Sequence, residues 1–283
     1  MQSAMKRYAR TAVVAAALGL SALGAAAKEP PHEGVEVGKS SRLAGLVPAA
    51  QVEQAADQQY HQLLQQAQAK NALAPATSPQ YKRLEAISQR LIPQSYAWNE
   101  RAKTWKWEVN VVGSQQVNAF CMPGGKIAVF TGIMDKLQLS DDELAMVVGH
   151  EMAHALREHA RARMSKGALT QGGMRIGGAV LSGIFGIDPH ITDMAARGAA
   201  SLLTLKFSRS DESEADLVGM ELAARAGYDP RAAITLWKKM AQASQGQPPQ
   251  WMSTHPSSTT RIAELERNIP RVMPLYQRTV AKR

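Results

Sequence analysis

Cysteine is almost absent from this chain of 283 residues, which contains only Cys121. One thiol can form no disulfide within the chain, so the fold must be stable without such a bridge even in an oxidising compartment. Any metal ion would have to be held by histidine and carboxylate side chains. Hydrophobic residues make up an ordinary 45% of the chain, which favours a globular protein with one sizeable core over a disordered one.

Long apolar runs are missing as well. The first apolar stretch, residues 11–24, is short and rich in alanine, which is not typical of a transmembrane helix. It follows a basic N-terminus and precedes three alanines, the arrangement of a secretory signal peptide. We therefore predict a cleaved signal peptide over residues 1–27 and export to the periplasm, with an uncleaved membrane anchor as the alternative.

The rest of the chain divides into a lead-in and one domain. Residues 28–49 mix proline and glycine with charges and predict a flexible lead-in to a domain over residues 50–283. Within that domain, residues 167–205 are rich in glycine and alanine, with an apolar core too short to cross a bilayer. A buried helix, a lid over a site and a segment that dips into a membrane are the three interpretations of this stretch.

The charge balance is mildly basic. Removing residues 1–27 deletes three positive charges and no negative one, which takes the formal net charge from +9 to +6. Such a protein could associate peripherally with an anionic membrane surface, although a charged exterior exposed to water is the simpler interpretation. We expect no nucleic-acid partner.

The segment 140–164 carries the clearest chemical signal, the sequence H-E-x-x-H at His150, Glu151 and His154. On a helix, four residues advance the direction by about 40° and the position by about 6 Å, so both imidazoles leave the same face and can reach one metal ion. Glu151 lies beside them as a group that can take a proton from metal-bound water. Ser140 with Glu143 forms a capping-box pattern, which predicts the start of this helix.

Three β-rich segments precede the motif, at residues 105–112, 116–122 and 126–131. The last two are separated by Pro-Gly-Gly, which suits a tight turn, and the pattern predicts a small meander. An edge strand beside a metal ion can hold an extended peptide by main-chain hydrogen bonds. Asn118, Ala119 and Phe120 are the substrate-binding candidates at that edge, and the alternative is that they only fill the sheet.

A catalytic zinc site needs a third protein ligand and one open position for water. In the segment 208–220, Glu212 and Asp216 are four residues apart and therefore share a helix face, whereas Glu214 faces elsewhere. Glu212 is the candidate ligand, and Asp216 could accept a hydrogen bond from the other nitrogen of a ligand imidazole. The alternative is the solvated, acidic start of a helix.

His159 is not expected to be a ligand. One class of metalloproteases uses the pattern H-E-x-x-H-x-x-G-x-x-H, but Arg157 and Ala160 stand where its glycine and last histidine would be. On a continuous helix, His159 would also point about 180° away from His150.

Two residues nearer the C-terminus are further candidates. His255 precedes a proline and a predicted helix that contains Arg261. Either cation could stabilise the oxyanion of a tetrahedral intermediate. His255 could instead occupy the open metal position and hold an enzyme inactive, or the pair could be a helix cap and a surface arginine.

With these segments identified, the chain resembles the family-48 zinc metallopeptidases, which include the CAAX prenyl proteases, HtpX and BepA. The matching segments lie between residues 117 and 262 and read VNAFCMPGGKIAVFTGI, LAMVVGHEMAHALREHARAR, SRSDESEAD and THPSSTTRI. The resemblance implies an α+β gluzincin fold that is mainly helical, with a small β-sheet beside the H-E-x-x-H helix.

The resemblance also implies a site. It assigns one Zn²⁺ per chain to His150, His154 and Glu212, and it makes Glu151 the general base. It places His255 and Arg261 near the metal.

The sequence thus predicts a zinc metalloendopeptidase of the bacterial cell envelope that cleaves misfolded or envelope proteins. The alternative is a chaperone-like protein that binds clients and has a plugged or structural zinc site. A closed structural site needs four protein ligands and has no use for an acid between the two histidines, so Glu151 favours the enzyme.

Overall fold

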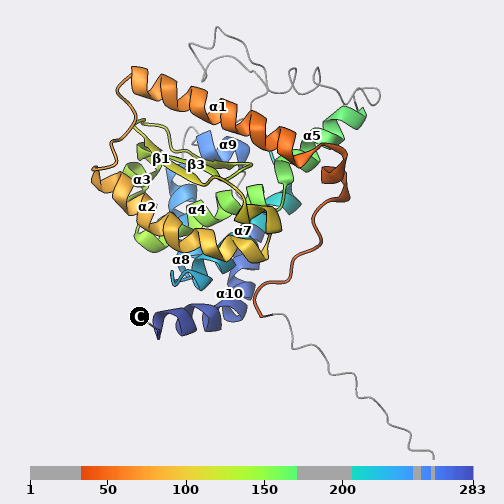
Figure 1. Ribbon diagram of the computed structural model, residues 1–283. Helices are drawn as coiled ribbons and strands as arrows, with labels where there is room; N and C mark the ends of the chain where they lie inside the picture. Colours follow the sequence, from red (N-terminus) through yellow and green to blue (C-terminus); the bar gives the residue numbers. More distant parts are fainter. Residues whose placement is uncertain (1–32, 171–205, 245–249, 256–258, 283) are drawn as a thin grey trace, which may run out of the picture. The chain divides into compact units, whose positions relative to one another are not determined.

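The structure of the protein is a computed structural model that describes residues 33–170, 206–244, 250–255 and 259–282 (Figure 1). The predicted signal peptide, residues 1–27, and nearly all of the segment 167–205 lie outside the described residues. Among the residues described, no helix combines the length and the apolar character that crossing a bilayer requires.

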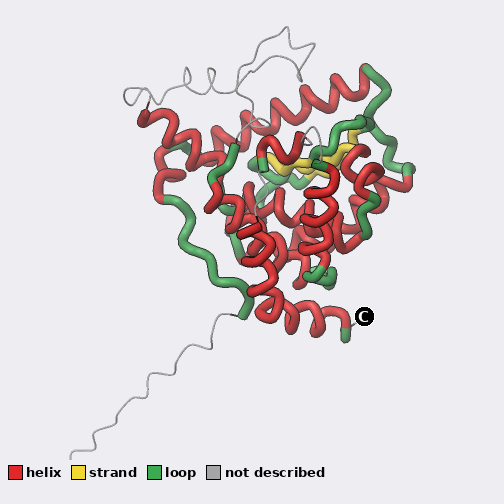
Figure 2. Tube along the Cα trace, turned by 180° about the vertical axis from the view of Figure 1, so that it is seen from behind, coloured by secondary structure: helices red, strands yellow, loops and turns green. Residues whose placement is uncertain are grey.

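Helices make up most of the described chain, and a small sheet accompanies them, as predicted. The longer helices are α1 (Ala49–Ala69), α2 (Pro79–Leu91), α3 (Thr131–Leu137), α4 (Asp141–Leu156), α5 (His159–Thr170), α7 (Arg209–Arg225), α8 (Ala232–Ala243) and α10 (Thr259–Val280). Short helical turns are η1 (Arg42–Leu46), η2 (Ile92–Ala97), η3 (Glu100–Lys103) and α9 (Gln250–Thr254). Seen from behind, the helices surround the sheet (Figure 2).

The sheet contains β1 (Glu108–Val112), β2 (Ala119–Met122) and β3 (Lys126–Phe130) in the order β1-β3-β2. The hairpin of β2 and β3 is antiparallel, and both glycines of its turn have φ angles of 80–86° that suit glycine. The predicted meander is wrong, because β1 pairs with β3 and runs parallel to it. The connection from β1 to β2 passes the end of β3, where Gly132 N–H donates to Ser114 O. It therefore places β2 on the side of β3 opposite to β1.

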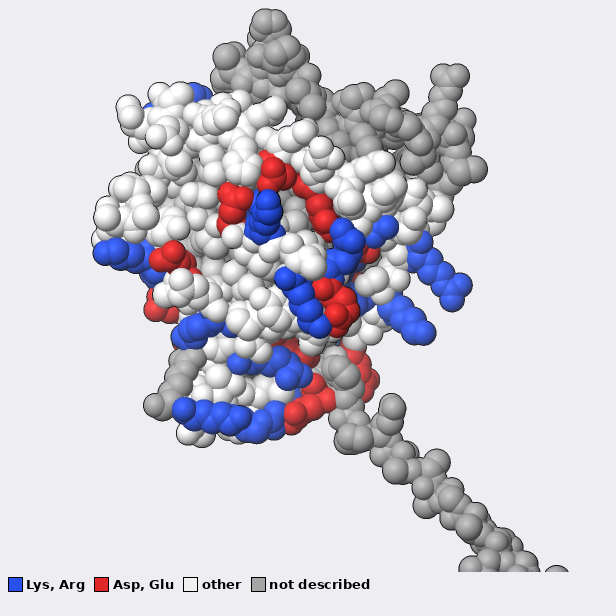
Figure 3. Space-filling view, in the orientation of Figure 1, with Lys and Arg blue, Asp and Glu red and all other residues white. Residues whose placement is uncertain are grey.

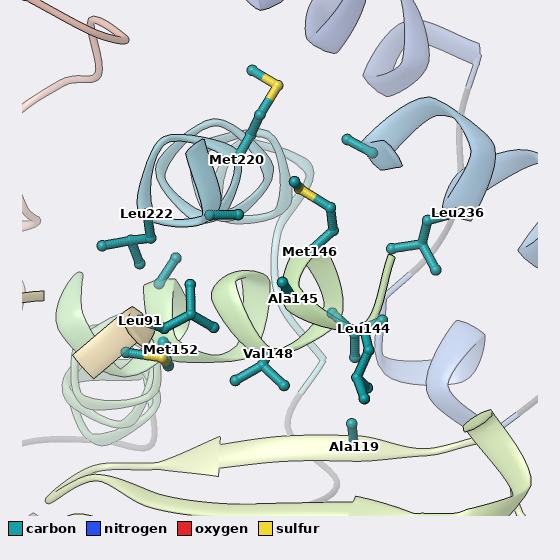
Figure 4. Close-up of a cluster of buried hydrophobic side chains, with 14 of the residues drawn as sticks. Leu91, Ala119, Leu144, Ala145, Met146, Val148, Met152, Met220, Leu222 and Leu236 are labelled. Carbon is teal, nitrogen blue, oxygen red and sulfur yellow. The ribbon is translucent and has the colours of Figure 1, made fainter. Parts of the chain in front are cut away.

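The two faces of the sheet contact different helices. Tyr60 of α1 packs over Phe120 on one face, and its hydroxyl donates to Ile127 O at 2.7 Å. On the other face, Leu144 and Val148 of α4 point toward the strand that carries Ala119 (Figure 4). The sheet is therefore a layer between α1 and α4 (Figure 1).

Helix α4 is the centre of the fold. Its N-terminus has the predicted capping box, in which Ser140 Oγ accepts from Glu143 N–H and Glu143 Oε2 accepts from Ser140 N–H. All of its residues from Glu143 to Leu156 are buried, because the sheet, α2, α7 and α8 contact it. The helix is therefore enclosed on every side by the rest of the domain.

Two further expectations differ from the structure. The helix of segment 140–164 is not continuous, because α4 ends at Leu156 and α5 begins at His159. Part of the expected flexible lead-in is packed: Val35 is only 1% exposed, and its N–H donates to Glu221 Oε2 at 2.7 Å. This bond gives the buried Glu221 carboxylate a partner and ties the segment to α7.

Candidate metal centre

Four side chains from three separate helical segments meet in the interior. His150 and His154 on α4, Glu212 on α7 and His255, directly after α9, each offer one ligand atom, and these atoms lie within 4.8 Å of one another. All four residues are buried. Imidazole nitrogens with one carboxylate are a donor set typical of zinc.

The spacing of these atoms also fits one ion. Two atoms bound tetrahedrally at about 2.0–2.1 Å from one zinc ion lie about 3.3–3.4 Å from each other. His150 Nε2 and His154 Nε2 are 3.2 Å apart, and each is 3.6 Å from an oxygen of Glu212. His255 Nδ1 is 3.3 Å from His150 Nε2 and 2.9 Å from Glu212 Oε1. The cluster therefore fits zinc, and His255 is close enough to be a fourth ligand.

A glycine contact brings the two ligand-bearing helices together. A Cβ atom on Gly149 of α4 would lie 2.7 Å from Gly219 O, and one on Gly219 of α7 would lie 2.6 Å from His150 N. Any larger residue at either position would push the helices apart. Because Asp216 lies one turn and Glu212 two turns before Gly219 on α7, this contact brings both carboxylates to the histidines.

Asp216 contacts His150 on the side away from the cluster. His150 Nδ1 lies 3.0 Å from Asp216 Oδ1, so its Nε2 is left to face the cluster. Arg261 of α10 donates to both oxygens of Asp216 at 2.6 and 2.8 Å, and its Nη1 is 2.9 Å from Glu212 Oε2. The guanidinium also lies 4.0 Å above the ring of Trp237. Arg261 thus orients the two carboxylates, and it is not among the residues that line the pocket between the cluster and the sheet. Its expected role in stabilising an oxyanion stays a prediction.

The buried charges shift the titration of the cluster in opposite directions. Burial lowers the pKa of His150, but hydrogen bonds with Asp216 and Glu212 outweigh it and raise that pKa to about 9. Burial, and after it the positive charge on neighbouring His150, holds the pKa of His154 well below its usual range. Burial would raise the pKa of Glu212, yet His150 and His255 lower it below its usual range, which favours the ionised carboxylate.

Glu151 is buried beside the metal cluster and is fixed by a residue that the sequence did not indicate. Trp251 Nε1–H donates to Glu151 Oε1 at 2.5 Å, and Trp251 N–H donates to Val117 O at 3.1 Å. This tryptophan is fully buried. It therefore holds the carboxylate in place and joins it to the chain that enters β2.

A pocket opens between the cluster and the sheet. Its lining includes the three edge candidates Asn118, Ala119 and Phe120, and it also includes Glu151, His154, Phe207 and His255. Within the part of the chain that the structure describes, β2 pairs only with β3, so its other side is an edge. The expected arrangement of an edge strand next to the motif helix is therefore present, and its role in binding substrate stays a prediction.

Two more residues near the cluster escaped the sequence reasoning. Phe207, just before α7, stacks on His154 with ring centroids 4.0 Å apart. His159 was excluded as a ligand and is not among the four clustered residues, but its Nδ1 lies 3.0 Å from His154 Nδ1. Phe207 lies outside every matching segment and His159 was considered only as a ligand, so it is the tertiary structure that brings both residues to the site.

Comparison with known proteins agrees with this geometry. Residues 78–269 match the family described as Peptidase family M48. Over 174 residues, the chain is 36% identical to the mitochondrial metalloendopeptidase OMA1 of Arabidopsis thaliana, covering 62% of this chain and 34% of that protein. The zebrafish (Danio rerio) metalloendopeptidase OMA1 is 35% identical over 220 residues, with coverages of 74% and 45%. The metalloprotease LoiP of Escherichia coli is 30% identical over 204 residues, with coverages of 72% and 76%.

The chain spans less than half the length of the two OMA1 relatives, and about three quarters of LoiP. The matched region contains every member of the buried cluster together with Glu151 and Arg261. The match extends over more than half of the chain and confirms the family expected from the sequence motifs. The chain belongs to peptidase family M48, whose metalloproteases depend on zinc.

Proposed function

We propose that the protein is a zinc metalloendopeptidase of the bacterial cell envelope that hydrolyses peptide bonds in misfolded or envelope proteins. The observation that carries this proposal is the position of Glu151. Its carboxylate is buried, lies next to His150 and His154 on α4, and lines the same pocket as the edge strand β2. A structural zinc site would have no use for an acid at this place.

His150, His154 and Glu212 would hold the metal, which when bound polarises the scissile carbonyl and makes a water molecule more acidic. Glu151 accepts a proton from that water and passes it to the leaving amine. Because the Trp251 N–H occupies Oε1 of Glu151, the other carboxylate oxygen is the one that carries the proton. The products are a carboxylate and an amine.

The edge of β2 would hold the substrate in an extended conformation. In an antiparallel pair, alternate residues direct their main-chain groups toward the partner strand. Phe130 N–H donates to Asn118 O, so in this register the main chain of Ala119 and Cys121 points away from β3 and toward the open edge. In the structure, Asn118 Oδ1 accepts a hydrogen bond from Ala119 N–H at 3.0 Å. A substrate carbonyl oxygen would replace Asn118 Oδ1 as the acceptor.

The envelope location is supported by the predicted signal peptide, and the similarity to the E. coli metalloprotease LoiP supports a bacterial metalloprotease. The OMA1 relatives are described as mitochondrial, so the location must be tested by cell fractionation. Peripheral membrane association stays a prediction. It would rely on basic side chains, and on the face shown in Figure 3 many of these lie beside acidic ones.

Replacing the proposed base gives the main test. The Glu151→Gln variant should bind zinc as the wild type does but lose nearly all cleavage of casein, because general-base catalysis contributes about 10²–10⁴-fold. Cleavage and zinc content are measured on the same purified samples. Full activity in Glu151→Gln would remove this residue from its role. Proteomics of the exported fraction, with wild type against this variant, would then identify natural substrates.

A client-binding protein with a closed site is the second candidate. The contact of His255 with both Glu212 and His150 favours it, since a fourth protein ligand would leave no position for water. If the purified wild type and the His255→Ala variant both bind unfolded casein without cleaving it, this alternative is supported.

A further inference from the structure

A second layer of side chains lies behind His154, on the side away from the cluster. His154 Nδ1 is 3.0 Å from His159 Nδ1, and His159 Nε2 is 3.3 Å from Glu214 Oε2. The other oxygen of Glu214 accepts a hydrogen bond from Arg157 Nε. His159 is 5% exposed and Arg157 is 7% exposed. These contacts connect Arg157 through Glu214 and His159 to His154.

The break between α4 and α5 is what puts His159 in this place. On a continuous helix, a residue five positions after His154 would point about 140° away from it. Instead Glu158 has a φ angle of 58°, a left-handed conformation that is unfavourable for a residue other than glycine. Asn99 Nδ2 donates to Leu156 O at 2.9 Å, and Arg161 Nη1 donates to Glu158 Oε1 at 2.7 Å. Side chains from two directions therefore stabilise a turn that returns His159 to His154.

The hydrogen bonds that link His154, His159 and Glu214 allow one arrangement of protons when His154 binds a metal. His154 would coordinate through Nε2, the nitrogen that faces His150, and its Nδ1 would then carry a hydrogen. That hydrogen is donated to Nδ1 of His159, which must be the acceptor. His159 therefore carries its own hydrogen on Nε2 and donates it to Glu214.

We propose that His159 is a positioning residue that fixes the ring orientation and tautomer of His154, with Glu214 fixing His159 in turn. This rests on the proposed metal-binding role of His154. The other ligand, His150, is held directly by Asp216, which Arg261 orients. Each ligand imidazole is thus supported by a carboxylate that an arginine contacts. Asp216 contacts His150 directly, whereas Glu214 acts on His154 through the imidazole of His159.

The test compares two replacements of His159. His159→Leu removes both ring nitrogens, whereas His159→Asn keeps an acceptor oxygen near the position of Nδ1. Zinc affinity is measured by chelator competition, and the geometry of the ligands by the visible spectrum of the Co²⁺-substituted protein. We expect His159→Leu to weaken zinc binding about 10–100-fold, the usual effect of losing such a partner, and to alter the cobalt spectrum. His159→Asn should recover most of the affinity.

A structural role would give a different result. If His159→Leu lowers the melting temperature of the metal-free protein but leaves zinc affinity and cobalt spectrum unchanged, the proposal is overturned. Equal losses of affinity in both variants would overturn it too. His61→Leu, on the surface of α1, is the matched control and should match wild type in every measurement.

The outcomes also separate this proposal from the proposed function. A wild-type protein that binds zinc but never cleaves casein would contradict the peptidase assignment, while the affinities of the His159 variants would still decide this proposal. A wild-type protein that binds no zinc would overturn both.

Discussion

Two groups of side chains in the described part of the protein are close enough to hold a metal ion, and they differ in their surroundings. The buried cluster consists of His150, His154, Glu212 and His255, and the exposed cluster consists of Asp57, His61 and Glu108. Side chains of the exposed cluster are 34–47% exposed, whereas those of the buried cluster are at most 4% exposed. Ligand types and distances alone do not distinguish the two clusters.

The contacts around the ligands do distinguish them. In the exposed cluster, His61 uses one ring nitrogen toward Asp57 and the other toward Glu108, at 3.4 and 3.3 Å. Lys126 Nζ lies 3.1 Å from Asp57 and also contacts Glu108, so one ammonium already pairs with both carboxylates. In the buried cluster, Asp216 and His159 contact the rear nitrogens of His150 and His154, and the two Nε2 atoms face each other. A second layer that leaves lone pairs pointing to one centre marks a metal site.

The largest effect should come from removing the carboxylate ligand. Glu212→Gln keeps the shape of the side chain but loses the charge that zinc requires, so zinc affinity should fall by more than the 10–100-fold typical of outer partners. Chelator competition measures the affinity, and circular dichroism checks that the fold is kept. Glu108→Gln in the exposed cluster is the matched control. Wild-type zinc affinity in Glu212→Gln would show that the third ligand is another residue.

Trp251→Phe should have an intermediate effect. The phenyl ring keeps the apolar contacts but removes the N–H that holds Glu151 Oε1. We expect kcat for a peptide substrate to fall about tenfold, a part of the 10²–10⁴-fold that a positioned general base contributes, with zinc affinity unchanged. Steady-state kinetics separate kcat from KM. A change in KM alone would indicate that Trp251 shapes the substrate pocket and does not position Glu151.

Replacing His255 should have a smaller effect, and of opposite sign. If its imidazole fills the fourth position, His255→Ala opens that position and basal casein cleavage should rise, while three ligands still retain zinc. Cleavage rates at equal zinc content measure this effect. Unchanged or lower cleavage would contradict the blocking role and favour a role for His255 in catalysis or in the structure.

The local parts of the site could be predicted from the sequence. Helical periodicity relates His150 to His154 and Glu212 to Asp216 without any knowledge of the tertiary fold, and the structure brings these residues together. The role of His150, His154 and Glu212 as metal ligands stays a prediction. The capping box at Ser140 was equally local and is confirmed.

The remaining features depend on the tertiary structure. Nothing in the sequence pairs Gly149 with Gly219, or directs Trp251 to Glu151. His159 was judged on a continuous helix, and the break occurs at Glu158, a residue whose type gives no signal for a positive φ angle. The strand segments were predictable, but the β1-β3-β2 order depends on how the connection passes the end of β3.

The smallest effect should come from the exposed cluster. His61→Ala removes its only imidazole, but both ring nitrogens are engaged with carboxylates and the side chain is 47% exposed. We expect unchanged zinc stoichiometry by elemental analysis, and a free energy of unfolding within about 0.5 kcal/mol of wild type, because exposed ion pairs contribute little. Loss of bound zinc in His61→Ala would mean that an exposed cluster containing an ammonium still binds metal. The arrangement of the second layer would then not be what distinguishes the two clusters.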